Sequence, residues 1–163
     1  MTVANDHLND VLETIATMQL AITCPAAQGL QTIQQAFAYM PFVVQSVNCP
    51  CFVNRVTGGK TNFQTSMGVQ RIPSTIKMAL LLVRADANSN LEDAQKEVLR
   101  WRTPVFRAFA AHIRLGGSFD WLMEASISEY TPFADFQYGA DAHFLASVFT
   151  LSVVESFPIT IGI

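Results

Sequence analysis

The chain has 163 residues, of which half are apolar and 14% are charged, and its formal net charge is −3. A charged share of roughly 25% is usual, so this apolar excess favours burial between subunits as well as within one core. The small negative charge excludes a general nucleic-acid binder with a basic stripe, and the aliphatic run at 78–83 is far shorter than the roughly 20 residues of a membrane span.

Length and cysteine content predict a single domain over 1–163 from a reducing compartment. A chain of this size can form one substantial core. Its three cysteines, an odd number, do not make a disulfide framework. The first residues lack the basic start and apolar centre of a signal peptide, so we expect a cytoplasmic origin with free thiols.

The N-terminal segment predicts a helix followed by a strand. Asn5 or Asp6 can cap a helix whose apolar residues recur at helical spacing, and this helix should end near 23–25. Residues 30–39 then suggest a strand with imperfect alternation, and the prolines of 41–50 bracket a linker that resembles a turn.

The middle of the chain predicts two strands and a loop. A short strand is expected at 51–56, and the polar, glycine-containing segment 57–68 indicates a long exposed hairpin loop. Residues 77–83 are apolar on both faces, which predicts a central strand covered on both sides. Pro73 lacks an amide hydrogen, so pairing before it should lie at an edge or outside the strand.

A long helix and two more strands complete the prediction. The capping-box pattern at 89–92 opens a helix with a broad apolar stripe. Pro104 should kink it or break it in two, and Gly116 and Gly117 should end it. Strands at 121–129 and 144–155 would then flank a loop at 130–141.

These elements predict an α+β fold. It would contain a mixed, mostly antiparallel β-sheet, flanked by the N-terminal helix and the long proline-interrupted helix, with an extended β-hairpin loop.

Charge is segregated along the chain. Bases outnumber acids at 84–114, whereas 115–163 carries six acids (Asp120, Glu124, Glu129, Asp135, Asp141 and Glu155) and no Lys or Arg. Opposite charges can pair within the fold or head to tail between neighbours. We expect the arginines to contact C-terminal acids, some of them across a subunit boundary. The candidate interface residues are Arg100, Arg102, Arg107, Asp135 and Asp141.

Two motifs invite a catalytic or cofactor interpretation. The run from Gly58 to Thr61 resembles part of a phosphate loop, but the required earlier glycine is replaced by Asn54, and no helix follows. Cys49 and Cys51 are two thiols without the second pair of ligands that a tetrahedral metal site needs, and small buried hydrophobes are the better interpretation. We expect no enzyme, metal or cofactor.

Several segments, in chain order, carry a resemblance to a known family. They are the Ala-Tyr-Met-Pro motif at 38–41, the passage 47–53, the strand 80–85, the Leu-Gly-Gly helix end at 115–117 and the last strand at 144–154. Together they cover most of 5–156, and they resemble the tail-terminator family of long-tailed bacteriophages, also called neck or tail-completion proteins.

The resemblance implies a structural role in the virion, with assembly in the host cytoplasm. Such proteins form a homohexameric ring on the tail tube, stop tail growth and meet the head-completion or connector protein. Genomic DNA passes through the lumen without specific binding, and no membrane or catalytic residue is involved. This chain differs from the family pattern in its proline-interrupted helix and in its apolar tail at 157–163. The tail is either a docking strand or a frayed end.

Two polar loops are expected to serve as assembly surfaces, one of them facing the lumen. They are 57–67 and 130–141, and their candidate residues are Gly58, Gly59, Lys60, Thr61, Phe133 and Gly139. One alternative to the terminator role is another neck component, such as a head-closure or adaptor protein. The other is a small-ligand-binding or enzymatic α+β domain.

Overall fold

The computed structural model describes residues 7–26, 29–59, 64–66, 69–84, 91–110, 114–117, 122–138 and 142–158. In this part of the chain the helices are α1 (His7–Leu20), α2 (Leu91–Ala110) and a short 3₁₀ helix, η1 (Ser46–Asn48). The strands are β1 (Thr23–Ala26), β2 (Gly29–Thr32), β3 (Gln35–Phe37), β4 (Cys51–Gly59), β5 (Gln64–Ser66), β6 (Val69–Arg84), β7 (Arg114–Gly117), β8 (Leu122–Tyr138) and β9 (Ala142–Pro158).

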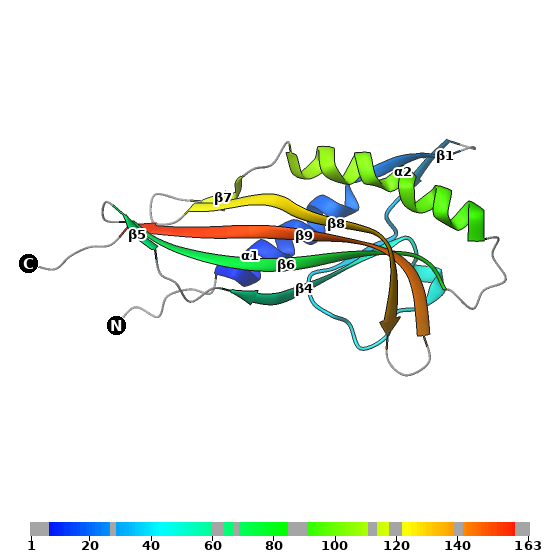
Figure 1. Cartoon of the computed structure of the whole chain (residues 1–163), viewed down its shortest axis with the longest axis horizontal. Coiled ribbons are helices and arrows are strands. Elements are labelled where there is room, and N and C mark those ends of the chain that lie inside the picture. The colour runs from blue at the N-terminus through cyan, green and yellow to red at the C-terminus, as the bar shows by residue number, and fades with distance from the viewer. Residues whose placement is uncertain are drawn as a thin grey trace, which may run out of the picture.

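One large sheet organises the fold. Its strands follow the order β3-β4-β6-β9-β8-β7, with β5 added to β6, and only the β3–β4 pair is parallel. Strands β6, β8 and β9 run side by side along the length of the molecule (Figure 1). Strands β1 and β2 form a separate two-stranded sheet. The predicted α+β class is therefore confirmed.

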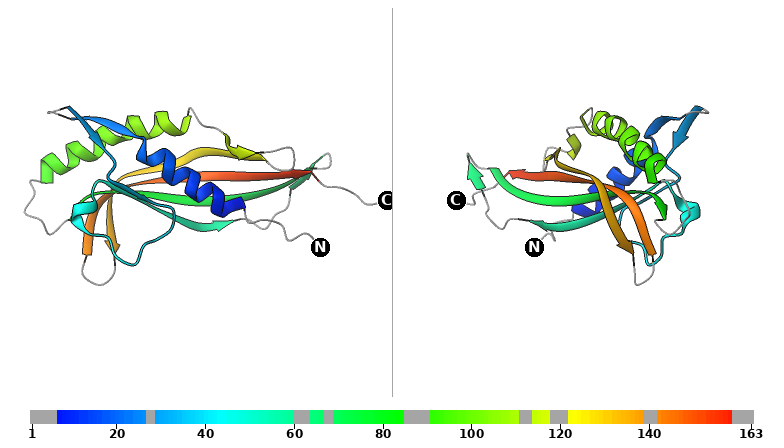
Figure 2. Two further views of the ribbon diagram at one scale, coloured as in Figure 1. Left: turned by 180° about the vertical axis from the view of Figure 1, so that it is seen from behind. Right: turned by 45° about the vertical axis from the view of Figure 1, so that its right-hand side comes forward.

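Both helices pack on the same face of the sheet. Alternate residues of β6, such as Met78 and Leu80, are buried in one cluster with Ile15 of α1 and Trp101 of α2. Figure 2 shows α1 lying across the sheet in the view from behind. Because successive side chains of a strand point to opposite faces of the sheet, Met78 and Leu80 share one face, and both helices pack on it.

The opposite face of the sheet carries a second, smaller core. Ala79 and Leu81 of β6 are buried there with Phe144 and Val44. Val44 belongs to the segment between β3 and β4, so this segment and not a helix covers the second face. The predicted central strand at 77–83, covered on both sides, is therefore confirmed at residues 78–81.

The loop predicted at 130–141 is wrong over 130–138, and residues 139–141 lie outside the described chain. Strand β8 continues to Tyr138, and a register shift between Thr131 and Ala134 interrupts its pairing with β9. A bulge leaves residues outside the ladder, so a proline at 132 is tolerated within the strand.

The extended hairpin predicted at 57–68 is present, but its described residues are strand and not loop, because β4 and β5 extend into it; residues 60–63, 67 and 68 lie outside the described chain. Gly58 and Gly59 pair with Thr75 and Ser74 in β6, and β5 pairs farther along the same strand. Pro73 lies between these two pairing regions and is itself paired with β9 only. Residues 69–71 before it pair with β5 on one side and with β9 on the other, so the expectation that pairing before Pro73 lies at an edge or outside the strand is wrong.

Helix α2 differs from its prediction at both Pro104 and the C-terminus. It ends at Ala110, and the two glycines lie in β7. It also runs through Pro104 as one helix and does not break. An interior proline costs about 3 kcal/mol, but Trp101 and Val105 are fully buried on either side of it. Burying such side chains offsets that cost, so tertiary packing holds the helix together.

The first helix and the strand after it differ from their predicted bounds. Helix α1 ends at Leu20, and β1 begins at Thr23, where the helix was expected to end. The single strand expected at 30–39 is two strands, β2 and β3, in different sheets. The capping serine expected at 89 lies outside the described residues.

Candidate functional site

The candidate interface arginines make contacts on or near their own helix. Arg100 Nη1 lies 3.4 Å from Glu97 Oε2, one turn earlier in α2. The guanidinium carbon of Arg102 lies 5.8 Å from the Phe106 ring centroid and 5.7 Å from that of Tyr130 in β8. These are cation–π contacts, and they hold α2 against the sheet.

Among the described residues of one chain, these arginines form no ion pair with the C-terminal acids. Their ion pairs there comprise the Arg100–Glu97 contact, and such an exposed pair contributes little. Asp135 lies in β8, with its backbone opposite Leu145, and Asp141 is outside the described residues. Contact across a subunit boundary remains a prediction.

The described residues assigned to assembly loops lie in two different strands. Gly58 and Gly59 are strand residues near the end of β4, where Gly58 has a φ of 157°. Phe133 lies at the β8 bulge and is partly exposed. Lys60, Thr61 and Gly139 lie outside the described residues.

An apolar loop, defined here as residues 39–47, is the most exposed hydrophobic segment described. Phe42 is 99% exposed and Val47 is 76% exposed. The other exposed large hydrophobic residues of the loop are Tyr39, Met40 and Val43. Single exposed apolar residues are common, but a run of five within nine positions is the mark of an interaction surface.

The apolar loop is held in one conformation by its own contacts. Val44 is buried in the second core and anchors the middle of the loop. The Asn48 amide donates to the Gln45 carbonyl at 2.9 Å, and the Gln45 amide donates to Asn48 Oδ1 at 3.1 Å. Tyr39 Oη lies 3.1 Å from Asn9 Oδ1 on α1. These contacts restrain the backbone of the loop at its start, middle and end.

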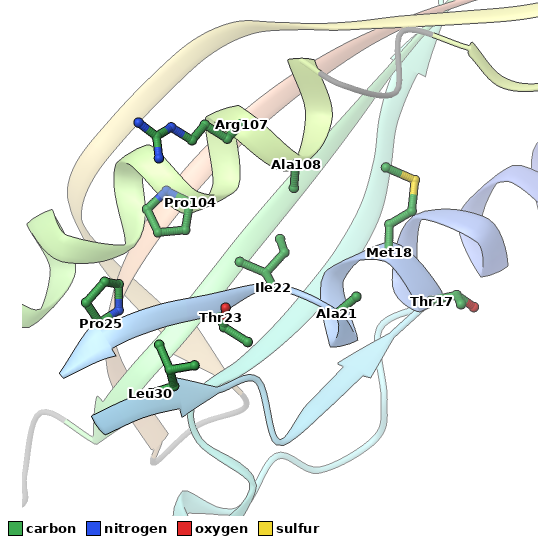
Figure 3. A pocket seen from close by; sticks show the side chains of 10 residues that line it. All are labelled: Thr17, Met18, Ala21, Ile22, Thr23, Pro25, Leu30, Pro104, Arg107 and Ala108. Carbon is green, nitrogen blue, oxygen red and sulfur yellow. The ribbon is translucent and has the colours of Figure 1, made fainter. Parts of the chain in front are cut away.

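A helix-end pocket of about 680 Å³ lies between the end of α1, the β1–β2 hairpin and α2. Figure 3 shows the side chains around it, most of them apolar or small. They are Thr17, Met18, Ala21, Ile22, Thr23, Pro25, Leu30, Pro104, Arg107 and Ala108. Leu30 is 71% exposed, and Arg107 supplies the charged group among these side chains. The pocket has the size of a ligand or peptide-anchor site.

The two neighbouring thiols have unequal environments. Cys51 is fully buried, whereas Cys49 is half-buried. A hydrogen bond from the Cys51 thiol lowers the pKa of Cys49, and burial opposes this shift. The same hydrogen bond, together with burial, raises the pKa of Cys51. Cys51 is thus buried, as expected for a small hydrophobic residue, and the lowered pKa predicts that Cys49 is the more reactive thiol.

A candidate metal centre is not seen in the described segments. Within them, no three His, Cys, Asp or Glu side chains lie close enough together to hold a metal ion. Burial raises the pKa of the Cys24 thiol, with nearby Glu97 adding to the rise and Arg100 opposing it, so this thiol is held in its protonated form.

Sequence reasoning missed both the apolar loop and the pocket. The loop had a usable signal, since Phe42, Val43 and Val44 follow Pro41 in a segment first interpreted as a simple turn. The pocket had none, because it forms where the segment 17–30 meets α2, which is distant in sequence.

None of the helices among the described residues is long and apolar enough to cross a membrane. Comparison with protein-family models and with curated protein sequences finds no match.

Proposed function

We propose that this protein is a structural virion protein that forms a ring, ends the tail tube of a long-tailed bacteriophage and joins it to the head-completion or connector complex. The observation that carries the proposal is the apolar loop. A fold that leaves Phe42 fully exposed on a segment pinned by buried Val44 is built for protein contact. The resemblance specifies which kind of assembly is expected.

The order of elements supports this role. Helix α1, the β3–β4 passage across Pro50, strand β6, helix α2 and the β8–β9 pair follow one another as in the resemblance. In this role the partners are other copies of the chain, the tail-tube protein and the head-completion protein. DNA would pass through the lumen, where a strongly cationic lining would hinder sliding. The protein would reside in the virion after assembly in the host cytoplasm.

Disruption of the gene in the virus that carries it tests the proposal. We expect filled heads and separate tails that exceed normal length, because tube growth is no longer stopped. Expression of the protein from a plasmid should restore tails of normal length joined to heads. Joined particles of normal length in its absence would refute the proposal.

The same experiment distinguishes the alternative neck roles. A head-closure or adaptor protein acts at the junction and does not control tube length. Its loss should leave tails of normal length that are not attached to heads, and that result would favour the alternative over the terminator role.

A further inference from the structure

We propose that the apolar loop of one copy docks in the helix-end pocket of a second copy. This head-to-tail contact deepens the proposed function and rests on it, because it names the surfaces that would join neighbouring subunits of the ring.

The loop has the properties of an anchor. Phe42 is 99% exposed, and aromatic residues that fill a pocket are frequent hot spots of binding energy. Val44 and the hydrogen-bonded turn at 45–48 already fix the loop, so little conformational entropy is lost on docking. Residues 39–47 include no charged side chain, so docking desolvates no charge from the loop.

The pocket has the properties of a receptor for such an anchor. Its volume of about 680 Å³ is in the range that encloses a ligand-sized group. Met18, Ile22 and Leu30 give it apolar walls. Arg107 is exposed, so its guanidinium can stay in water when an apolar group enters.

The positions of loop and pocket require two copies. Val44 anchors the loop on the face of the sheet that carries the second core. The pocket is formed by α1, β1, β2 and α2, on the side of the helices. In both views of Figure 2 the tip of the β1–β2 hairpin points upward and the segment between β3 and β4 lies below the hairpin. Neither feature therefore fills the other within one chain.

A second copy explains both features together. The loop is an uncharged apolar projection and the pocket has apolar walls, so one contact between two copies accounts for both features without a further partner. When an apolar projection on one part of a surface fits a pocket elsewhere on the same molecule, the contact is heterologous. Such contacts repeat from copy to copy, and they close into a ring when the rotation between copies permits.

Two variants remove one half of the contact each. Phe42→Ser removes the anchor, and Ala21→Trp fills the pocket from an exposed position at the end of α1. The matched controls are Leu99→Ser, which removes a 52% exposed apolar side chain from α2, and Gln95→Trp, which adds the same bulk at an exposed site of α2. All four sites are exposed, so circular dichroism and thermal midpoints should match those of the wild type.

Sedimentation velocity over a concentration series provides the readout. The wild type and both controls should associate, and each test variant should weaken association by at least about 30-fold, as expected for loss of a hot spot. A mixture of the two test variants should form a one-to-one dimer and nothing larger. In that dimer the intact loop of the Ala21→Trp chain occupies the intact pocket of the Phe42→Ser chain.

Three outcomes would overturn the proposed contact. The first is a wild-type protein that stays monomeric at about 1 mM, the weak limit of specific binding. The second is association that both test variants leave unchanged, in which case another surface joins the copies and the ring proposal survives. The third is a mixture of the variants that forms no dimer. In that case the pocket would bind a small molecule or another protein and not the loop. If the contact is found but gene disruption leaves tails normal, the contact stands and the virion role fails.

Discussion

Gln19 and Asn54 exchange two hydrogen bonds of 2.8 Å although both side chains are fully buried. The residues are 35 positions apart and connect the last turn of α1 to β4. Asn54 Nδ2 also lies 2.9 Å from the Phe37 carbonyl in β3, which it can reach as a donor. This closed amide pair fixes how α1 crosses the sheet, and thereby positions one wall of the helix-end pocket.

We predict that Asn54→Ala lowers the free energy of unfolding by about 1–3 kcal/mol, because the buried Gln19 amide loses its partner. Urea denaturation measures this change. The double variant Gln19→Met/Asn54→Leu should lose less free energy of unfolding than Gln19→Met and Asn54→Leu lose in sum, since neither amide of the pair is left without its partner. Additive losses would show that the two side chains act independently.

Tyr130 provides a second test of buried polar groups. Its hydroxyl is buried with no hydrogen-bond partner among the described residues, while its ring lies 4.8 Å from that of Phe149, measured between centroids. Tyr130→Phe should leave thermal stability unchanged or raise it by up to about 1 kcal/mol, because only an unsatisfied group is removed. Tyr130→Ala should cost about 3–5 kcal/mol. A Phe variant as unstable as the Ala variant would reveal an essential hydroxyl contact.

The three cysteines should differ in their reaction with iodoacetamide. The hydrogen bond from Cys51 lowers the pKa of Cys49, so its reactive thiolate forms at a lower pH than that of an ordinary thiol. The pKa values of Cys24 and Cys51 are raised, so their thiolates form later. Peptide mapping across pH 6–9 should find Cys49 labelled first. The variant Cys51→Ala removes the hydrogen-bond donor, so the pH at which Cys49 becomes reactive should rise. The variant Cys51→Ser replaces the thiol donor with a hydroxyl donor. Equal labelling of all three would contradict this account.

Arginine charge should set the alignment of neighbouring subunits. Reversing Arg100, Arg102 and Arg107 to Glu should weaken association and invert its salt dependence, because the new carboxylates repel the acids of the neighbouring C-terminal region and salt screens that repulsion. Each pair at a rim contributes only about 0.2–1 kcal/mol. The measurement is the association constant at low and high salt, and Lys96→Glu is the matched single control. An unchanged constant with unchanged salt dependence would show that these arginines do not lie at a subunit boundary.

The sequence predicted elements best where one physical preference acted alone. The apolar residues on both faces of β6 required burial on both sides, and Met78 and Ala79 are indeed buried in different cores. The helical spacing around Val11 and Ile15 likewise led directly to α1.

Prediction failed where tertiary contacts override a local breaker. Pro104 remains inside α2 because Trp101 and Val105 are buried beside it. Pro132 lies within β8 because a bulge removes its need for an amide hydrogen. A breaker residue indicates a possible end of an element, while long-range packing and pairing decide whether the element ends there.

The candidate site was the least predictable part of the molecule. Local polarity pointed to two loops, but strands occupy much of both. The exposure of Phe42 depends on the burial of its neighbour Val44, and the pocket depends on the meeting of α1, β1 and α2. The burial of Val44 in the second core and the meeting of 17–30 with α2 are contacts between distant segments, so no short window of sequence contains them.

The number and place of copies in the virion test the central claim most directly. Electron cryomicroscopy of purified particles, with the density of the neck fitted by this fold, gives both. The account predicts six copies of the chain in one closed ring on the last ring of the tail tube, facing the head-completion complex. A single copy, a ring of another order, or a ring at another position in the particle would contradict it.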